Sequence, residues 1–331
     1  MPRERDVSGL KITWQILVCL ALLANCAGQN VVVPARPGPI GYPAGPFREQ
    51  LHWIPAGDIL DPARLLYARV CRPTGEQPAR IVVIAHGTPA DPTRRPSMMP
   101  IACDHETIQW FMARGFVAVA GIRRGYGLTG GRWVETTGRC SAAEFVAAAR
   151  EGAHDLDATV RYARNLPYAR ADGVVVVGQS AGGWAALGYN SVPHPHVVAM
   201  VSMAGGRGGR VGNIPHTNCR PEELVRAAST LGATATTPML WIYTENDTFF
   251  SPRLARAMHD AFRHSGASAR LFQLGPFRED GHSLFFGPGG SAIWGPLVAD
   301  YLVGRSELGP STHPSMKATE QAGRQSWERL E

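Results

Sequence analysis

Short apolar runs recur along the chain, separated by longer segments in which apolar residues repeat at helical spacing. A run without alternating polar residues is typical of a strand that is buried on both faces of a parallel sheet. Helical segments between such strands indicate a doubly wound α/β domain with a mostly parallel sheet. We predict strands at residues 65–70, 80–85, 116–122, 174–178, 197–203, 239–243 and 270–274, and helices at residues 103–114, 141–165, 181–189, 222–231 and 291–303, with a further helix beginning at Ser251.

Two of the helix starts carry capping signals. Ser141 and Glu144 have the spacing of a capping box, in which each side chain bonds the other residue's backbone amide. Ser251 is followed by Pro252, which places a capping serine before a proline whose missing N–H costs nothing in the first turn. The Pro- and Gly-rich residues 31–48 predict an extended leader before the domain.

The N-terminus has the layout of a signal peptide. Basic residues precede the apolar run Ile16–Ala24, which suits an export signal and is too short to span a bilayer. We predict a signal peptide over residues 1–28 and an exported protein, periplasmic or secreted, with lipoprotein anchoring through Cys26 left open. A short N-terminal helix of a cytosolic protein is the alternative. The domain then covers residues 29–304, followed by a polar, mobile tail at residues 305–331.

No later segment has eighteen consecutive apolar residues, so we expect no stable membrane insertion after cleavage of the signal peptide. The net charge of +6 comes almost entirely from arginines, which are scattered along the chain. Nucleic-acid binding requires a basic stripe or a recognition motif, and we therefore predict no nucleic-acid partner. The Gly-rich stretch Ala204–Gly212 lacks the spacing and ending of phosphate-binding loops and predicts a turn-rich loop.

In an exported protein the cysteines are expected to form disulfides. Four of them follow the predicted signal peptide, at Cys71, Cys103, Cys140 and Cys219. In an oxidising compartment four cysteines allow two disulfides in three connectivities, among which the sequence does not decide. Our preference is Cys71 with Cys103 and Cys140 with Cys219, and four buried free thiols are the alternative. No cysteine or histidine spacing resembles a zinc site, so we predict no metal.

The pentapeptide Gly178–Gly182 (GQSAG) stands between a predicted strand and a predicted helix. A serine at so sharp a turn is held in a strained backbone conformation with its Oγ exposed, and glycines two residues away on each side prevent collisions. The following helix directs its N-terminal amides at the same point. A turn alone requires the glycines but not the serine, and we therefore predict that Ser180 is a nucleophile.

A second loop follows the strand at residues 80–85, which runs directly into His86-Gly87-Thr88. A loop at this position supplies a backbone N–H to the oxyanion hole of a G-x-S-x-G hydrolase. Gly87 allows the chain to turn close to the acyl oxygen. We predict the backbone amides of Thr88 and Ala181 as the two oxyanion donors, and His86 as a packing residue under the loop.

An acid and a histidine follow two later strands. Asp247 comes just past the strand at residues 239–243, and His282 follows the last predicted strand. Both fall on loops at the carboxyl edge of the sheet, beside Ser180. We predict that His282 accepts the serine proton and that Asp247 orients the imidazole. Glu245 is the alternative acid, and Asp280 is predicted to form a turn.

The segments IVVIAHG, GYGLTGG, GQSAGG, LWIYTENDTFF and EDGHSLF occur in this order and resemble the α/β-hydrolase superfamily. More narrowly they resemble exported members of its dienelactone-hydrolase-like branch, over residues 50–303. The resemblance implies the α/β-hydrolase fold and the triad Ser180, Asp247 and His282. Dienelactone hydrolases use a cysteine nucleophile, and the serine of this chain favours an esterase.

Hydrolases of this superfamily often insert a cap domain where this chain has Gly205–Pro221. The segment is too short for a helical lid, so we expect a minimal or absent cap and an open site. Aromatic residues near the motifs are the expected walls of the substrate site, with core packing as the alternative. They are Tyr126, Trp184, Phe249, Phe250 and Phe285.

We therefore predict a serine hydrolase that cleaves a small-molecule or polymeric carboxylic ester through an acyl-enzyme, without a cofactor. A serine peptidase of the prolyl-oligopeptidase type is the first alternative, although the chain has no room for the propeller that usually gates such enzymes. A non-catalytic binding protein on a hydrolase scaffold is the second alternative.

Overall fold

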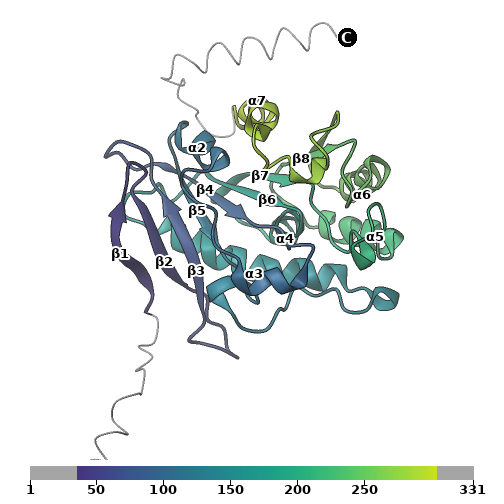
Figure 1. Ribbon diagram of the computed structural model, residues 1–331, viewed down its shortest axis with the longest axis horizontal. Helices are drawn as coiled ribbons and strands as arrows, with labels where there is room; N and C mark the ends of the chain where they lie inside the picture. The colour runs from purple at the N-terminus through teal and green to yellow at the C-terminus, as the bar shows by residue number, and fades with distance from the viewer. Residues whose placement is uncertain (1–35, 304–331) are drawn as a thin grey trace, which may run out of the picture. The chain divides into compact units, whose positions relative to one another are not determined.

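Nine strands form one sheet at the centre of the molecule (Figure 1). This structure is a computed structural model that describes residues 36–303, so the predicted signal peptide over residues 1–28 and the predicted tail over residues 305–331 lie outside it. The strand order is β1-β2-β3-β5-β4-β6-β7-β8-β9, antiparallel from β1 to β5 and parallel from β5 to β9. The strands are β1 (Gly38–Ala44), β2 (Glu49–Pro55), β3 (Leu65–Cys71), β4 (Arg80–Ala85), β5 (Phe116–Gly121), β6 (Val174–Gln179), β7 (Val197–Met203), β8 (Met239–Thr244) and β9 (Ala269–Leu274).

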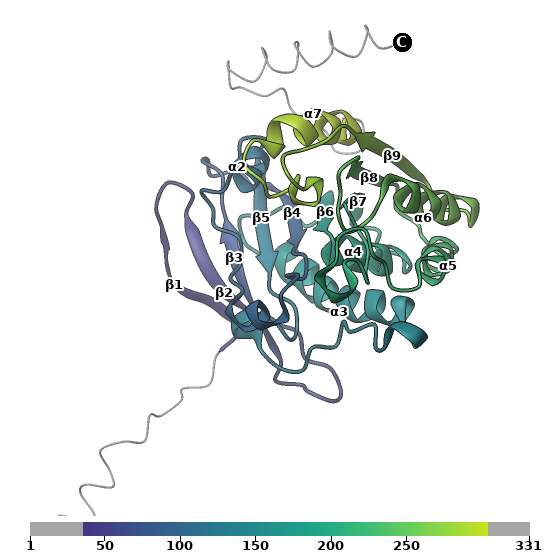
Figure 2. The same ribbon diagram turned by 45° about the vertical axis from the view of Figure 1, so that its right-hand side comes forward.

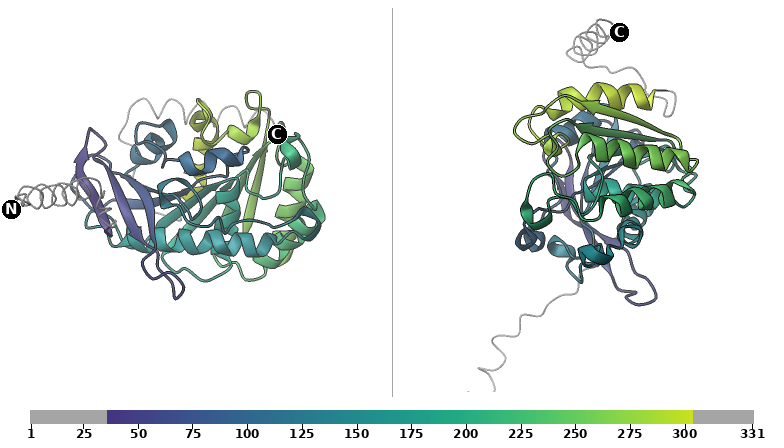
Figure 3. Two further views of the ribbon diagram at one scale, coloured as in Figure 1. Left: turned by 60° about the horizontal axis from the view of Figure 1, so that its bottom comes forward. Right: turned by 90° about the vertical axis from the view of Figure 1, so that its right-hand side faces the viewer.

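The central parallel strands are buried on both faces, which explains their uninterrupted apolar runs. In β4, Ile81 and Val83 pack with helices α3 to α6, whereas Val82 and Ile84 pack with α2 and α7. The two helical layers lie on opposite sides of the sheet (Figure 2), and the left-hand view of Figure 3 has the sheet between them. Among the described residues, no helix is both long and apolar enough to cross a membrane. The helices are α2 (Glu106–Met112), α3 (Phe145–Arg164), α4 (Ala181–Asn190), α5 (Pro221–Gly232), α6 (Pro252–His264) and α7 (Gly290–Leu302).

The doubly wound, mostly parallel sheet is confirmed, but β1 and β2 form a hairpin that the sequence did not predict. Strand β1 lies at the edge of the sheet, is almost wholly exposed and contains Pro39 and Pro43. An edge strand tolerates proline because its outer N–H groups have no strand to bond. Since β1 buries neither face, its sequence has no apolar pattern from which a strand could be predicted.

One of the two capping signals is confirmed and the other is wrong. Ser251 caps α6 by accepting a hydrogen bond from the Leu254 amide at 3.3 Å. Helix α3 begins only at Phe145, and Glu144 makes no capping bond with its side chain. Ser141 and Ala142, which we predicted in its first turn, belong instead to a separate 3-10 turn, Cys140–Ala142. A disulfide ties that turn to the loop before α5.

Both preferred disulfides are present, Cys71–Cys103 and Cys140–Cys219, which removes the alternative of four free thiols. The first bond is buried and joins the end of β3 to the segment before α2. The second bond joins an exposed cysteine, Cys140, to the buried Cys219. It links two loops that lie far apart in the sequence, at a separation of 79 residues.

The topology of the sheet places the predicted site. From β4 the chain crosses to β5 on one side, and from β5 it crosses back over β4 to β6 on the other. In open α/β sheets, ligands bind where the order reverses in this way, outside the carboxyl ends of the strands. The loop of Gly87 and Thr88 follows β4, and Ser180 follows β6, so both lie at this point.

Candidate active site

Ser180 occupies a strained turn between β6 and α4. Its φ is 54° and its ψ is −118°, a backbone conformation that residues other than glycine rarely adopt. The flanking glycines are sterically required: a Cβ on Gly178 would lie 2.1 Å from the Gly182 carbonyl oxygen, and one on Gly182 would lie 2.2 Å from the Ala85 carbonyl oxygen. The turn therefore has the strain and the glycine requirement that the pentapeptide predicted, but Ser180 is only 7% exposed, not exposed as predicted.

The loop after β4 passes directly against this serine. A Cβ on Gly87 would lie 3.1 Å from the Cβ of Ser180 and 2.2 Å from Oε1 of Gln179, so any larger residue here would have to displace the Gln179 side chain. Within the described residues, neither the Thr88 amide nor the Ala181 amide donates a hydrogen bond to the protein. Ala181 begins α4, whose N-terminus favours negative charge. Both amides are thus free for an oxyanion, as the predicted roles require.

His86 is held in one tautomer beneath that loop. Its Nδ1 lies 2.8 Å from the Gly87 carbonyl oxygen, to which it donates, because its Nε2 accepts a hydrogen bond from the Arg123 amide at 3.1 Å. Burial, reinforced by the charge of Arg123, lowers the pKa of His86 to about 3, so the ring is neutral at physiological pH. This agrees with the packing role predicted from the sequence.

Asp247 and His282 meet at the other side of the serine turn. His282 Nδ1 lies 3.0 Å from Asp247 Oδ2 and 3.1 Å from Oδ1. The Asp247 side chain is fully buried, and its Oδ1 also accepts hydrogen bonds from the amides of Phe249 and Phe250. The Phe249 ring stacks on the imidazole at a centroid distance of 4.0 Å. Glu245, the alternative acid, is exposed at the end of β8, so the geometry favours Asp247.

Asp280 joins the two loops that carry this pair. Its Oδ1 accepts hydrogen bonds from the amides of His282 at 3.0 Å and Thr248 at 3.1 Å, and its Oδ2 accepts one from the Thr248 hydroxyl at 2.5 Å. Partial burial raises the pKa of Asp280, but the hydrogen bonds from Thr248 and His282 outweigh it and lower the pKa below its usual range. Asp280 is therefore more than the turn former that we predicted, because it also ties the acid loop to the histidine loop.

Gln179 connects the serine turn to the histidine loop. Its Nε2 donates a hydrogen bond to the His282 carbonyl oxygen at 3.1 Å, and it immediately precedes Ser180. In the part of the chain that the structure describes, the side chains of Ser180 and His282 form no hydrogen bond with each other. Catalytic hydrogen bonds are often long in a free enzyme and shorten when substrate binds. The structure thus pairs Asp247 with His282 and ties the loop of His282 to the serine turn.

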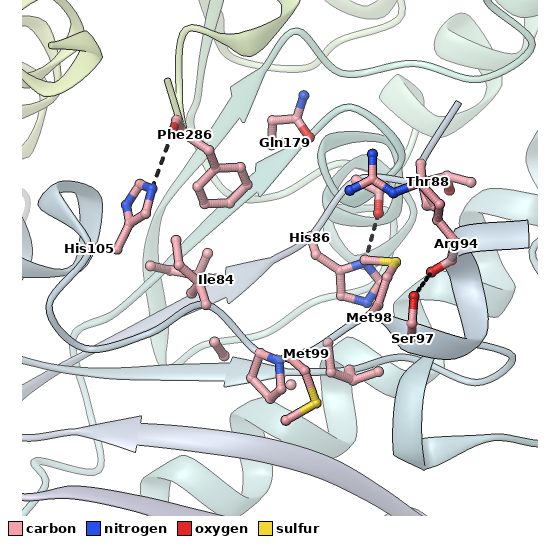
Figure 4. Close-up of a pocket in the computed structure, with 17 residues that line it drawn as sticks. Ile84, His86, Thr88, Arg94, Ser97, Met98, Met99, His105, Gln179 and Phe286 are labelled. Carbon is pink, nitrogen blue, oxygen red and sulfur yellow. Dashed lines mark hydrogen bonds between the residues drawn. The ribbon is translucent and has the colours of Figure 1, made fainter. Parts of the chain in front are cut away.

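A cleft of about 510 Å³ is lined by Gln179, which precedes Ser180, and extends toward His105, which precedes α2; Ser180 and His282 themselves are not in its lining. Figure 4 shows Ile84 and Phe286 on one side of it and Met98 and Arg94 on the other, with His86 between. This pocket could not be predicted from the sequence, because Met98 and its neighbours lie in an irregular loop after β4 that has no periodic pattern. Most of its lining is apolar, from Ile84, Pro89, Met98, Met99, Pro100, Ile101, Ala120, Ile122 and Phe286.

The aromatic residues that we expected as walls do not line this cleft. Tyr126, Trp184, Phe250 and Phe285 have exposed fractions of 1% or less and pack in the interior. Trp184, for example, donates its Nε1 hydrogen to the Phe145 carbonyl oxygen inside the core. Of the five residues, Phe249 stands nearest to the reacting groups, because it stacks on His282.

Within residues 36–303 we find no cluster of three or more His, Cys, Asp or Glu side chains that could hold a metal ion. The segment between β7 and α5 contains only a short 3-10 turn, Val211–Asn213, and no helical lid, as its length predicted.

Comparisons with solved structures show the fold. The Pyrococcus horikoshii acylaminoacyl peptidase has a TM-score of 0.56 at 13% identity, over 83% of this chain and 44% of the peptidase. The Pyrococcus furiosus esterase Pf2001 has a TM-score of 0.52 at 16% identity, over 81% of this chain and 98% of the esterase. The Porphyromonas gingivalis dipeptidyl peptidase 4 has a TM-score of 0.54 at 14% identity, over 78% of this chain and 36% of that enzyme. This chain thus spans less than half of the length of either peptidase.

Sequence comparison shows the family. No curated protein matches the chain. Residues 99–329, more than half of the chain, match the model of the Dienelactone hydrolase family. The strand order, the serine turn and this match agree with one another, and the chain therefore belongs to the dienelactone hydrolase family.

Proposed function

We propose that this protein is a serine hydrolase that cleaves carboxylic esters through an acyl-enzyme, with Ser180, His282 and Asp247 as its triad. The observation that carries this proposal is the Asp247–His282 hydrogen bond, located beside a serine in a strained strand-to-helix turn. Dienelactone hydrolases have a cysteine nucleophile, and the serine here supports an esterase within that family.

The first half of the reaction forms the acyl-enzyme. His282 Nε2 takes the proton of Ser180 as its Oγ attacks the ester carbonyl carbon, and Asp247 stabilises the resulting imidazolium through Nδ1–H. The amides of Thr88 and Ala181 bind the oxyanion, and each such donor contributes about 10²–10³ in rate. His282 then gives its proton to the leaving alkoxide, and the alcohol departs.

The second half reverses these roles with water. The oxygen of a water molecule attacks the acyl carbon while His282 accepts a proton from that water. The same proton passes to Ser180 Oγ when the carboxylic acid is released. Every proton taken by the histidine is thus returned, and the enzyme ends unchanged.

The cleft next to Ser180 is the proposed site of the acyl group. Gly87 and Gln179 border both the serine and this cleft, so an ester carbonyl at Ser180 can direct its acyl part into the cleft. Its walls are mainly apolar, and the flexible Met98 and Met99 can adapt to different chains. We expect apolar acyl groups to be preferred, in small-molecule or polymeric esters.

A serine peptidase is the second candidate function, because two of the proteins similar in structure are peptidases. The mainly apolar cleft that Gln179 and Gly87 border supports the ester as the substrate.

The two candidates separate on chromogenic substrates. We expect turnover of p-nitrophenyl esters, rising with acyl length until the cleft is filled, and little turnover of aminoacyl p-nitroanilides. Ser180→Ala should abolish ester turnover, whereas Ser191→Ala, at the far end of α4, should leave it unchanged. Faster cleavage of the anilides would favour the peptidase, and folded protein inactive on both would favour a binding protein.

We also propose that the protein is exported. The predicted signal peptide supports this location, and two disulfides are expected in an oxidising compartment and rare in a reducing one. Cell fractionation followed by N-terminal sequencing of the mature protein tests it, and a mature N-terminus at Cys26 would indicate lipoprotein anchoring.

A further inference from the structure

A closed ring of hydrogen bonds lies behind the loop that carries the proposed oxyanion donor. Arg207 Nη1 donates to Thr88 Oγ1 at 2.9 Å, and the hydroxyls of Thr88 and Tyr126 are 2.6 Å apart. Tyr126 donates to Glu135 Oε2 at 3.3 Å, and the same carboxylate oxygen accepts from Arg207 Nη2, which closes the ring. Arg123 pairs with the other carboxylate oxygen, Oε1 of Glu135. We call these five residues the Glu135 ring.

The Glu135 ring holds three charges away from water. The side chain of Glu135 is 0% exposed, that of Arg123 is 3% exposed and that of Arg207 is 7% exposed. Burial opposes ionisation of Glu135, but the two guanidinium groups outweigh it and hold the pKa of this carboxyl at about 2. Two positive groups therefore face one negative group, and the ring carries a net positive charge. Buried ion pairs of this kind are weak contributors to stability compared with apolar packing, so their presence points to another role.

Two separate contacts connect this ring to the loop His86-Gly87-Thr88. Through its side chain, Arg207 holds the Thr88 hydroxyl. Through its backbone amide, Arg123 holds His86, whose other ring nitrogen donates to the Gly87 carbonyl oxygen. The loop is thus anchored at both ends to residues that share the Glu135 carboxylate.

Glu135 and Arg207 both come from irregular segments that are fixed in place. The Gly206 amide donates to the Ser180 carbonyl oxygen at 3.1 Å, so the segment before Arg207 lies against the serine turn. Further along, the Cys219 amide donates to the Gly208 carbonyl oxygen at 2.7 Å, and Cys219 is bonded to Cys140 in the segment of Glu135. The disulfide therefore joins the two loops that supply the ring.

We propose that Glu135 and Arg207 are positioning residues for the oxyanion hole: through the Thr88 hydroxyl they fix the direction of the Thr88 amide toward the developing oxyanion. This inference rests on the proposed function. A preorganised amide stabilises the transition state without reorganisation during the reaction, and an error of about 1 Å in its position can cost about 10²-fold in rate. The net positive charge of the ring favours the same negative oxygen from behind the loop.

The test removes one hydroxyl and leaves the buried charges in place. Thr88→Val keeps the size of the side chain and the backbone amide but deletes both hydrogen bonds of Oγ1. We expect kcat on a p-nitrophenyl ester to fall about 10- to 100-fold, with KM changed less than about twofold. Affinity for a trifluoromethyl ketone, which forms an oxyanion on reaction with serine, should fall in parallel with kcat. Thr88→Ser, which keeps the hydroxyl, should retain most of the wild-type kcat and most of the affinity for the ketone.

The matched control is Thr129→Val, which removes a hydroxyl that bonds the Ile122 carbonyl oxygen and the Tyr67 amide outside the ring. It should leave kcat and inhibitor affinity nearly unchanged. The inference is overturned if Thr88→Val keeps the wild-type kcat, if Thr129→Val loses as much, or if only KM rises. Wild-type protein inactive on every ester would instead overturn the proposed function, so the two failures are distinguishable.

Discussion

The two sides of Ser180 are supported in different ways. On the oxyanion side, the loop of Thr88 is held by buried ion pairs around Glu135, which is wholly enclosed. On the histidine side, His282 is held by one buried carboxylate, a stacked phenylalanine and the partly exposed Asp280. The side that would bind charge with backbone amides is thus supported by charges, whereas the side that would move protons is supported mainly by hydrogen bonds and ring packing.

This difference matches the physical demands on each side. Amides that bind an oxyanion must point in one direction throughout the reaction, because reorganisation would add to the barrier. A histidine that takes a proton from serine and delivers it to a leaving group needs a fixed tautomer and small adjustments in distance. Variants that perturb one side at a time should therefore have different effects.

The largest effect is expected for Asp247→Asn on the histidine side. The amide would leave the imidazole without its negative partner and favour the wrong tautomer, and kcat should fall by about 10⁴-fold. Steady-state kinetics on a p-nitrophenyl ester measure this change. Glu245→Gln, two residues away and exposed, is the control and should keep the wild-type rate; an equal loss in both variants would contradict the assignment of the acid.

Removal of either disulfide should lower stability, but only removal of Cys140–Cys219 should also lower activity. Replacing Cys140 and Cys219 with serine should lower the free energy of unfolding by roughly 2–4 kcal/mol and also lower kcat, because this bond joins the loops of Glu135 and Arg207. Replacing Cys71 and Cys103 should cost a similar free energy while kcat is retained. Urea unfolding measures the stability of both variants, and ester kinetics measure their kcat. Equal kcat values would contradict a link between the Cys140–Cys219 disulfide and the loop of Thr88.

A smaller effect is expected for Asp280→Asn. The variant weakens the hydrogen bonds that tie Thr248 to His282, and we expect about 1 kcal/mol less stability and about a tenfold lower kcat, with KM little changed. Asp300→Asn, whose side chain is 72% exposed, is the matched control. If Asp280→Asn raised only KM, Asp280 would act on substrate binding rather than on the histidine loop.

The smallest effect at neutral pH concerns stability, and it grows only in acid. The folded-state pKa of His86 is lowered to about 3, chiefly by burial, and that of His52 to about 4 for the same reason. Below the unfolded pKa of about 6.5 the unfolded chain takes up protons that the folded protein does not, so stability falls as pH decreases. Between pH 6.5 and 4.5 each histidine contributes a slope of up to about 1.4 kcal/mol per pH unit. Urea titrations should show a shallower slope for His86→Gln; an unchanged slope would mean that His86 is protonated in the folded state.

The fold and the serine turn were predictable because their signals are local. A buried parallel strand has an apolar run, and a nucleophile between a strand and a helix needs glycines at Gly178 and Gly182. Asp247 and His282 could be proposed because residues just past parallel strands meet at one edge of the sheet. Strand β1 and the start of α3 were mispredicted, since the first buries neither face and the predicted start of the second lies in a separate 3-10 turn, Cys140–Ala142.

The Glu135 ring could not be predicted from the sequence. Arg207 lies in a glycine-rich stretch that indicated only a turn-rich loop, and it is 72 residues from Glu135. No periodic pattern marks either position, because both residues reach the site from irregular segments. Tyr126 was predicted as a wall of the substrate site, but it is buried and its hydroxyl lies inside this ring, which the sequence does not reveal.

The most direct test of the account is labelling of the nucleophile with a fluorophosphonate probe, followed by proteolysis and mass spectrometry. Folded wild-type protein should carry one covalent adduct on the peptide that contains Ser180, at a rate that falls sharply in His282→Ala. Ser180→Ala should not be labelled, and Ser191→Ala should be labelled at the wild-type rate. Folded protein that takes up no label, or an adduct on any other residue, would contradict the assignment of Ser180 as an activated nucleophile.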